Sequence, residues 1–279
     1  MSLKKVSEIL KMADNAGYAV PAFNVFNYES ISWLIEAARE EQSPVIAMLY
    51  PASSKYIPIS TFAAITRDLA EKVDIPVGLH FDHSSSFKGV MGGIKNGFPS
   101  VMIDGSSLEY EENISLTTKV VETSHALDVD VEAELGFVGS ASRTEDFQNE
   151  NYYTEPERAK DFIDKTGVDA LAVAIGSAHG NYVSTPDLDL SRLEKINKTV
   201  DLPLVLHGGS GIPESQIKKA VKRGINKVNI GTELNQIFYR KFRDIVKEEG
   251  KKGSMQGSLS HLKEDIKLYY KNKIRLLQE

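Results

Sequence analysis

Eight short apolar segments alternate along the chain with segments whose apolar residues recur at helical spacing. The apolar segments are residues 19–27, 44–50, 76–83, 100–106, 130–137, 169–176, 202–209 and 227–232. They are apolar almost throughout, as strands are when both faces of a parallel sheet are covered by helices. Repeated strand–helix units predict an α/β fold, and eight of them favour a closed (β/α)8 (TIM) barrel over an open doubly wound sheet.

The segments between these strands have the amphipathic pattern of helices that cover a barrel. They include residues 29–42, 61–72, 111–127, 156–167 and 213–224. Because no Pro/Gly/Ser-rich linker or internal repeat divides the chain, we predict a single domain over residues 1–279. Two parts exceed a minimal barrel: a polar loop at residues 138–157 and an extra C-terminal helix at residues 261–279.

The composition limits the classes of partner. The 279 residues carry a net charge of −6, which gives no basic surface of the kind that binds nucleic acid. The apolar segments are too short to cross a bilayer, and the amphipathic start at residues 1–18 lacks the apolar core of a signal peptide. We therefore expect a cytoplasmic protein with neither nucleic-acid nor membrane partners. Because the chain has no cysteine, any metal would be bound through nitrogen and oxygen.

Enzymes with a (β/α)8 fold place their catalytic groups where the strands end. The polar residues at the predicted strand ends are Asn24, Asp82, His83, Asp104, Glu132, Glu134, His179, His207, Asn229 and Thr232. Three of the six histidines therefore fall at the ends of three different strands. A single histidine there is more often a hydrogen-bonded polar residue, but His83, His179 and His207 together match a zinc site with an open coordination position.

Other ionisable residues have competing interpretations. His80 lies inside its strand and deeper in the barrel, so we predict a core or supporting histidine rather than a ligand. Glu132 and Glu134 share one strand face, which is costly unless they meet cations or hydrogen-bond donors. Asp104 either caps the following turn or, together with Glu134, holds a second cation. The two remaining histidines, which we expect to be structural, are His125 and His261.

Glycine and hydroxyl residues follow the last two strands. The segments HGGSG (207–211) and NIGT (229–232) occupy the two loops that commonly bind phosphate in these barrels. Gly180 adds a third position at which a backbone can approach a ligand closely. One short Gly-rich segment is usually only a turn, but two at these strand ends predict a phosphate site. A metal site beside a phosphate site suggests a phosphorylated substrate with an oxygen to polarise.

Seven motifs, taken in this order, resemble the class II (metal-dependent) fructose-bisphosphate and tagatose-bisphosphate aldolases. They are FNVFN, LHFDHS, VMIDGSSLEYEENI, VEAELG, TGVDALAVAIGSAHGNY, LHGGSGIP and KVNIGTEL. The likeness extends from about residue 5 to 245. It implies reversible aldol cleavage of a ketose 1-phosphate or 1,6-bisphosphate to dihydroxyacetone phosphate and an aldehyde, in carbohydrate metabolism such as glycolysis, by a homodimer or homotetramer.

The resemblance also implies roles for individual residues. A zinc ion would be bound by His83, His179 and His207, beside Asp82 as the catalytic acid/base. Asp104 and Glu134 would belong to an alternative or second cation site. The residues that would hold the phosphate of dihydroxyacetone phosphate are Gly180, Gly208, Gly209, Ser210, Asn229, Ile230, Gly231 and Thr232. Asn24 would join this substrate-binding set.

The chemistry of the family explains these residue types. Cleavage between C3 and C4 leaves an enediolate, whose negative charge zinc stabilises as a Lewis acid. Asp82 would take the C4 hydroxyl proton during cleavage and return it during condensation. A further acid must exchange the C3 proton, and in the family this group lies on the loop that corresponds to residues 138–157. Glu145 is the matching candidate in this sequence.

The sequence departs from the family where a distal phosphate would bind. The segment LYPASSKY places Tyr50 and Pro51 where related enzymes carry a Ser/Thr and Gly pattern, and Ser53 is only a candidate stand-in. The tail segment GSMQGSLSHLK lacks the arginine that binds the distal phosphate of fructose bisphosphate. The lysines that could compensate are Lys55, Lys251 and Lys252, although such lysines are usually solvated. We therefore expect a substrate with a smaller, uncharged or differently charged distal end.

Three other functions compete with the aldolase. A zinc-dependent hydrolase of the amidohydrolase type would carry His-x-His after the first strand, where this chain reads FNVFN. A Schiff-base aldolase needs a lysine inside a barrel strand, and residues 169–176 contain none. A non-catalytic sugar-phosphate binding protein would keep the glycine loops without needing Asp82 beside three histidines.

Overall fold

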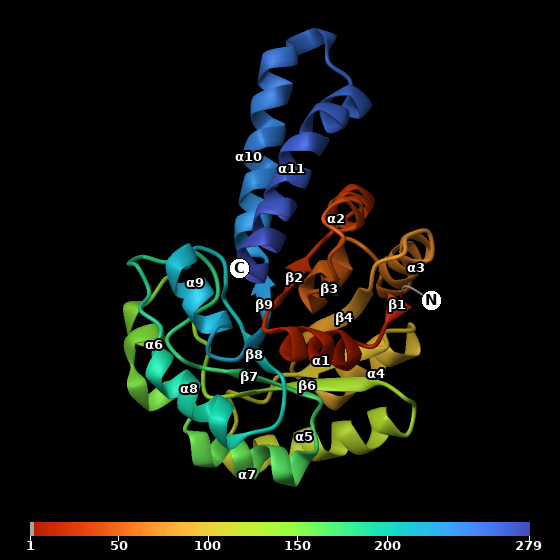
Figure 1. Ribbon diagram of the computed structural model, residues 1–279. Coiled ribbons are helices and arrows are strands. Elements are labelled where there is room, and N and C mark those ends of the chain that lie inside the picture. Colours follow the sequence, from red (N-terminus) through yellow and green to blue (C-terminus); the bar gives the residue numbers. More distant parts are fainter. Residues whose placement is uncertain (1–2) are drawn as a thin grey trace.

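Eight strands close into a parallel barrel in the computed structural model, which describes residues 3–279 (Figure 1). They are β2 (Val20–Asn24), β3 (Val45–Leu49), β4 (Val77–Ser84), β5 (Ser100–Ile103), β6 (Asp130–Leu135), β7 (Ala170–Val173), β8 (Leu204–Leu206) and β9 (Ile225–Ile230). The β2–β9 and β4–β5 pairs close the ring, and every neighbouring pair is parallel. The predicted (β/α)8 barrel is confirmed.

Helices surround this barrel, cross its bottom and extend from it. They are α1 (Val6–Ala16), α2 (Tyr28–Glu40), α3 (Ile59–Ala70), α4 (Phe87–Lys95), α5 (Tyr110–His125), α6 (Thr144–Gln148), α7 (Pro156–Thr166), α8 (Leu190–Thr199), α9 (Glu214–Val221), α10 (Thr232–Glu249) and α11 (Met255–Gln278). Three short 3-10 helices complete the described elements, namely η1 (Pro51–Lys55), η2 (Glu150–Tyr152) and η3 (Gly250–Lys252). The main core lies between the outward strand faces and the helices, where Phe98 contacts both Phe62 and Phe81.

The N-terminal segment closes the bottom of the barrel. The two-residue strand β1 (Leu3–Lys4) pairs with the start of β4, and α1 follows across the barrel end. Ile9 and Leu10 of α1 form one apolar cluster with inward residues of the strands, among them Ala22, Met48 and Val205. Because the bottom is filled by apolar side chains, polar groups reach the interior only farther along the strands.

The C-terminal helices α10 and α11 pack side by side and project from the barrel as an arm (Figure 1). The predicted C-terminal helix is therefore confirmed, and it begins earlier than expected, at Met255. The polar loop at 138–157 contains two short helices, α6 and η2, which the sequence pattern did not indicate. No helix among the described residues is long and apolar enough to cross a membrane.

Candidate active site

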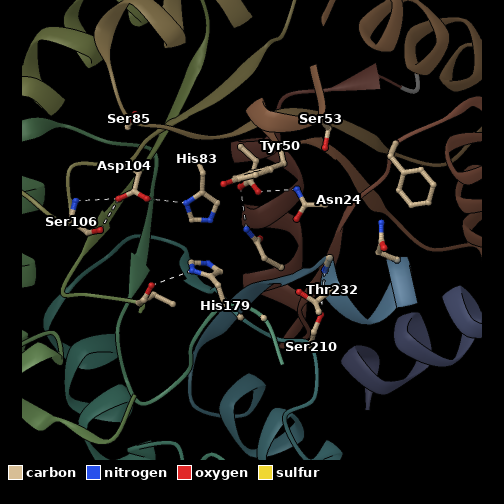
Figure 2. Close-up of a pocket in the computed structure, with 18 of the residues that line it drawn as sticks. Asn24, Tyr50, Ser53, His83, Ser85, Asp104, Ser106, His179, Ser210 and Thr232 are labelled. Carbon is tan, nitrogen blue, oxygen red and sulfur yellow. Dashed lines mark hydrogen bonds and ion pairs between the residues drawn. The ribbon is translucent and has the colours of Figure 1, made fainter. Parts of the chain in front are cut away.

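A cavity of about 780 Å³ opens at the C-terminal ends of the barrel strands. Figure 2 shows that side chains from distant parts of the chain converge on it. Its lining includes twelve of the residues predicted from the sequence: Asn24, Ser53, Asp82, His83, Asp104, His179, Gly180, Gly208, Ser210, Asn229, Gly231 and Thr232. His207 and Glu134 lie buried behind this lining. Three predicted residues lie outside it, namely Gly209, Ile230 and Glu145.

A bulge in β4 gives Asp82 and His83 access to the same cavity. Regular alternation along a strand would direct Asp82 into the barrel and His83 away from it. The register of β4 against β5 shifts between Phe81 and Ser84, and His83 has a φ of 40°, in the left-handed region. This irregularity turns the His83 side chain toward the cavity, which both residues line.

The three histidines form a compact group: His83 on β4, His179 in the loop after β7 and His207 in the loop after β8. The ring centroids of His83 and His179 are 4.7 Å apart, and those of His83 and His207 are 4.6 Å apart. One ligand atom from each histidine can be chosen so that all three lie within 4.8 Å of one another. His83, Asp104 and Glu134 form a second such group. The two candidate sites therefore share His83.

Hydrogen bonds orient two of these rings. Nδ1 of His83 lies 3.0 Å from Asp104 Oδ2, and Nδ1 of His179 lies 3.2 Å from the carbonyl oxygen of Val138 (Figure 2). A carbonyl oxygen only accepts, so Nδ1 of His179 donates and Nε2 keeps its lone pair. That Nε2 is buried and has no hydrogen-bond partner among the described residues. Burial, with the neighbouring His83 and His207, lowers the pKa of His179 to about 3, which favours a neutral ring.

His207 is held between two carboxylates of β6. Its Nε2 lies 2.9 Å from Glu132 Oε1, and its Nδ1 lies 2.9 Å from Glu134 Oε2. Burial opposes protonation of the ring, but these two hydrogen bonds outweigh it and raise the pKa of His207 to about 10. Glu132 also pairs with Lys227 of β9. The expectation that Glu132 and Glu134 meet cations or donors is thus confirmed.

Lys227 is a residue that the sequence analysis did not single out. It is fully buried, and its Nζ lies 2.6 Å from Glu132 Oε2. Alternation along β9 places it on the same inward face as Asn229, which was the available signal. His80 lies in the same interior region, where its Nδ1 contacts the hydroxyl of Ser100 at 2.8 Å. Its buried position agrees with the core or supporting role expected of it.

The residues around the histidines fit a divalent metal ion. Four carboxylates lie in or just beneath the group, whereas Lys227 is the one lysine there in the described chain. These carboxylates are Asp82, Asp104, Glu132 and Glu134. The buried Nε2 of His179 without a partner, and the all-nitrogen and oxygen donor set, suit a catalytic zinc site with three histidine ligands.

Two asparagine side chains hold the carboxylate of Asp82. Asn24 Nδ2 donates to Oδ2 at 2.9 Å, and Asn229 Nδ2 donates to Oδ1 at 3.3 Å. Burial opposes ionisation of Asp82, but the nearby His83, Lys227 and His207 outweigh burial and lower its pKa. The ionised carboxylate is therefore fixed at the cavity wall, where it can accept a proton.

The loops after β7 and β8 approach each other at glycines. Gly208 has a φ of 66°, and a Cβ at this position would collide with the backbone of Ala178. The hydroxyl of Tyr182 joins the two loops, since it accepts from Ala178 N at 2.8 Å and donates to Gly208 O at 3.0 Å. Tyr182 was also missed by the sequence analysis. Gly209 donates its N–H to Asn229 O at 3.0 Å, which ties this loop to β9.

The helix α10 begins at the cavity wall. Ser210 Oγ accepts from the amides of Gly231 and Glu233 at 3.3 and 3.2 Å, at the first turn of α10. Gly231 and Thr232 line the cavity at the same point. Amides and partial positive charge at a helix N-terminus favour anions. Ile230, in contrast, directs its side chain into the outer core.

The opposite side of the cavity carries Tyr50 and Ser53. The Tyr50 ring meets the His83 ring edge to face, with centroids 6.2 Å apart. No lysine or arginine among residues 3–279 lines the cavity. Glu145 is exposed on α6, whereas the neighbouring Asp146 is buried and accepts from Ser140 N at 2.9 Å. The structure thus anchors α6 through Asp146 and leaves Glu145 outside the cavity.

Comparisons with known proteins agree with this geometry. The family model described as fructose-bisphosphate aldolase class-II matches residues 4–279. The YdjI aldolase from Escherichia coli K12 is 35% identical, with a TM-score of 0.87 over 99% of this chain and 97% of that one. A putative fructose-1,6-bisphosphate aldolase from Coccidioides immitis is 26% identical, with a TM-score of 0.86 over 98% and 96% of the two chains. Fructose-bisphosphate aldolase from Campylobacter jejuni is 25% identical, with a TM-score of 0.83 over 99% and 95%. The resemblance seen in the sequence is confirmed, and the chain belongs to the class II fructose-bisphosphate aldolase family.

Proposed function

We propose that this aldolase uses zinc to catalyse reversible cleavage of a ketose 1-phosphate to dihydroxyacetone phosphate and an aldehyde. The observation that carries the proposal is the meeting of three groups in one cavity. These groups are the three histidines, the carboxylate of Asp82, and the glycine and serine loops at the start of α10. A hydrolase or a sugar-phosphate binding protein would not need all three together.

In this proposal His83, His179 and His207 hold the zinc ion. When bound, zinc supplies a Lewis acid for the negative charge that develops as the C3–C4 bond breaks. Asp104 fixes the His83 ring through Nδ1, and Val138 O fixes the His179 ring. Asp104 and Glu134 with His83 are also the group that would hold a second or alternative cation.

Asp82 is the proposed acid/base. Its carboxylate takes the proton of the C4 hydroxyl in the cleavage direction and returns it to the aldehyde oxygen in condensation. Asn24 and Asn229 leave the carboxylate little freedom to rotate, because each donates to a different oxygen. This fixed orientation reduces the entropy that must be lost on the way to the transition state.

The phosphate of dihydroxyacetone phosphate is assigned to the loops after β7, β8 and β9. Gly180, Gly208, Ser210 and Thr232 line that wall of the cavity, and their backbone N–H groups and hydroxyls are the proposed phosphate ligands. The N-terminus of α10 adds favourable electrostatic potential for a dianion. Gly209 and Ile230 are not proposed to contact the phosphate. Their role is to set the course of the backbone that brings the three loops together.

Glu145 remains the proposed group for exchange of the C3 proton. Because Glu145 is exposed on α6, this role requires α6 and its flanking loop to move toward the cavity when substrate binds. Phe137 and Val138 already line the cavity from the start of that loop. The proposal is thus separate from the role of Asp82 and is tested separately.

The distal end of the substrate is proposed to carry no phosphate that the enzyme recognises strongly. The cavity has no lysine or arginine in its described lining, and Tyr50 and Ser53 occupy the side away from α10. Phosphate recognition gains most from charge-assisted hydrogen bonds, which neither residue supplies. A ketose with only a C1 phosphate therefore suits the cavity better than a bisphosphate.

A Schiff-base mechanism receives no support from Lys227. This lysine lies inside a barrel strand, but it is fully buried, ion-paired with Glu132 and absent from the cavity lining. A nucleophilic amine must reach the substrate carbonyl. The position of Lys227 does not meet this condition.

We also propose a homodimer or homotetramer in the cytoplasm. Exposed apolar side chains lie along the α10–α11 arm, among them Tyr239 and Met255 at 68% and 61% exposed. Such side chains are often covered in oligomers. Sedimentation of the purified protein distinguishes a monomer from these assemblies.

Assays of dihydroxyacetone phosphate release test the proposed function. The panel contains fructose 1-phosphate, fructose 1,6-bisphosphate, tagatose 1,6-bisphosphate and ketose 1-phosphates with other distal ends. We expect release from at least one ketose 1-phosphate by the zinc-loaded enzyme. Absence of release from every sugar phosphate, with zinc bound, would reject the proposed reaction.

A further inference from the structure

A buried ion pair lies directly beneath the histidine group. Nζ of Lys227 on β9 is 2.6 Å from Oε2 of Glu132 on β6, and the two side chains are 0% and 1% exposed. Removing two charges from water is costly, and apolar residues of similar volume often stabilise a protein as well. Stability alone therefore does not explain why this pair occupies the barrel interior. Glu132 also contacts a second residue, and this contact suggests a role for the pair other than stability.

That second contact is with His207. Oε1 of Glu132 lies 2.9 Å from Nε2 of His207, while Lys227 occupies the other carboxylate oxygen. A carboxylate paired with lysine is an acceptor only, so Nε2 of His207 must be the donor. The series Lys227, Glu132, His207 thus fixes the orientation of the ring and keeps a proton on Nε2.

The other ring nitrogen, Nδ1, faces the remaining candidate ligands. It lies 2.9 Å from Glu134, whose carboxylate forms a group with His83 and Asp104 in which the ligand atoms lie within 4.8 Å. Glu134 is held less firmly than Glu132. In the described part of the chain it pairs with no lysine or arginine, and its other hydrogen bond, from Val138 N, is 3.4 Å long.

We propose that Lys227 and Glu132 are positioning residues, which hold His207 by Nε2 so that Nδ1 is the atom presented to the metal. Glu134 is the carboxylate that would give up its contact with Nδ1, and the proton on Nδ1 would leave to solvent when the metal binds. The proposal rests on the proposed function in one respect, namely that the three histidines bind zinc. Neither Lys227 nor Glu132 lines the cavity, so neither touches the substrate there, and their contact with the three histidines is through His207. Loss of such a supporting carboxylate typically weakens metal binding 10- to 100-fold.

Two double variants separate the hydrogen bond from the ion pair. Glu132→Leu with Lys227→Met removes both charges and the acceptor for His207. Glu132→Gln with Lys227→Met also removes both charges, but the amide oxygen still accepts from Nε2. Zinc dissociation constants are measured by competition with a chelator, after circular dichroism and thermal unfolding have established that each metal-free protein is folded. We expect roughly 10- to 100-fold weaker zinc binding in the leucine variant and near wild-type binding in the glutamine variant.

A matched control lies far from the cavity. Lys267 of α11 pairs with Glu40 of α2 at 2.6 Å, and the Lys267 side chain is 8% exposed. Glu40→Gln with Lys267→Met removes an ion pair of similar length, and zinc binding should stay unchanged. Weakened zinc binding in this control as well would mean that the loss is a general effect of destabilisation and would overturn the proposal.

The outcomes distinguish this proposal from the proposed function. A folded leucine variant that binds zinc as tightly as wild type overturns the positioning role. Wild-type protein that fails to bind zinc counts against the proposed function instead. A crystal structure of the zinc-loaded wild type needs no variant: we expect Nδ1 of His207 on zinc and Nε2 on Glu132. Coordination through Nε2 overturns the proposal even if the variants do not fold.

Discussion

Asp82 and His83 are neighbours in the chain, yet both side chains line the same cavity. The left-handed backbone at His83, with a φ of 40°, makes this possible within a strand that otherwise alternates. Strain of this kind persists only where the surrounding structure enforces it. A proton-transfer group and a metal ligand are thereby placed on one rigid element of the barrel.

Replacement of Asp82 by alanine should separate zinc binding from catalysis. Zinc content should stay at the wild-type level, because Asp82 is not one of the proposed zinc ligands. The cleavage rate should fall roughly 10²- to 10⁴-fold, or about 3–5 kcal/mol in the barrier, as for a positioned acid/base. Exchange of the C3 proton of dihydroxyacetone phosphate with solvent should suffer much less.

The Glu145→Ala variant is the matched comparison. It should lose C3 proton exchange. It should lose less of the proton transfer at the C4 hydroxyl than Asp82→Ala does, because Asp82 performs that step. Both properties are measured by proton NMR in deuterated solvent and by steady-state cleavage assays. If Asp82→Ala abolishes exchange and leaves cleavage intact, the assigned roles are wrong.

A methyl group at Gly208 should disturb the proposed phosphate site. Gly208→Ala places a Cβ against the carbonyl of Ala178, whereas at Gly17, with a similar φ of 73°, a Cβ would meet no described atom within 4 Å. Gly17→Ala should cost about 1–2 kcal/mol in the free energy of unfolding, from the left-handed backbone alone. Gly208→Ala should cost more and should also raise KM for the phosphorylated substrate. Equal effects on stability and KM in the two variants would contradict the close approach of the two loops.

The absence of basic residues from the described cavity lining predicts the substrate preference. A half-buried phosphate without a guanidinium partner lacks hydrogen bonds worth about 1.5–3 kcal/mol. A bisphosphate should therefore gain little in kcat/KM over the corresponding ketose 1-phosphate. Steady-state kinetics on fructose 1-phosphate and fructose 1,6-bisphosphate provide the ratio. A preference above about 100-fold for the bisphosphate would mean that a basic group reaches the distal phosphate after all.

The contact between α2 and α11 should give a pH-dependent contribution to stability. Hydrogen bonds from Lys267 and then Lys271 lower the pKa of Glu40 to about 2, from the ordinary 4.5. The folded protein favours the ionised form, so this contribution is complete above pH 4.5 and is lost as the pH falls toward 2. Glu40→Gln should lower Tm at pH 7, and the difference from wild type should shrink between pH 4.5 and 2. Thermal unfolding of both proteins across this pH range tests the prediction. A difference in Tm that stays constant would contradict the assigned role of Glu40.

The barrel was predictable because its strands are buried on both faces and therefore read as continuous apolar runs. Polar residues at the ends of those runs then marked the cavity, and Asn24, Asp82 and His179 all line it. The bulge at His83 was not predictable, since alternation alone directs that side chain outward. The helix α6 was also missed, because it is only five residues long and buries just Asp146, which is hydrogen-bonded, and Phe147.

Lys227 shows a different limit of sequence reasoning. A lysine in a strand is usually exposed, and its burial is explained only by Glu132, which lies 95 residues away in the chain. The pattern had indicated that Glu132 and Glu134 needed cationic or donor partners, but not which residues these were. Which residues meet across a barrel depends on how the barrel closes and on the register of its strands. The periodicity of a single strand gives no information on either.

Metal dependence of cleavage tests the central claim most directly. The measurement is dihydroxyacetone phosphate release by the enzyme before chelation, after chelation and after addition of zinc. We predict loss of activity on chelation, recovery with zinc, and no lysine adduct when substrate is treated with borohydride in the presence of the enzyme. Full activity in the metal-free protein, together with a borohydride-trapped substrate adduct on a lysine such as Lys227, would contradict the account.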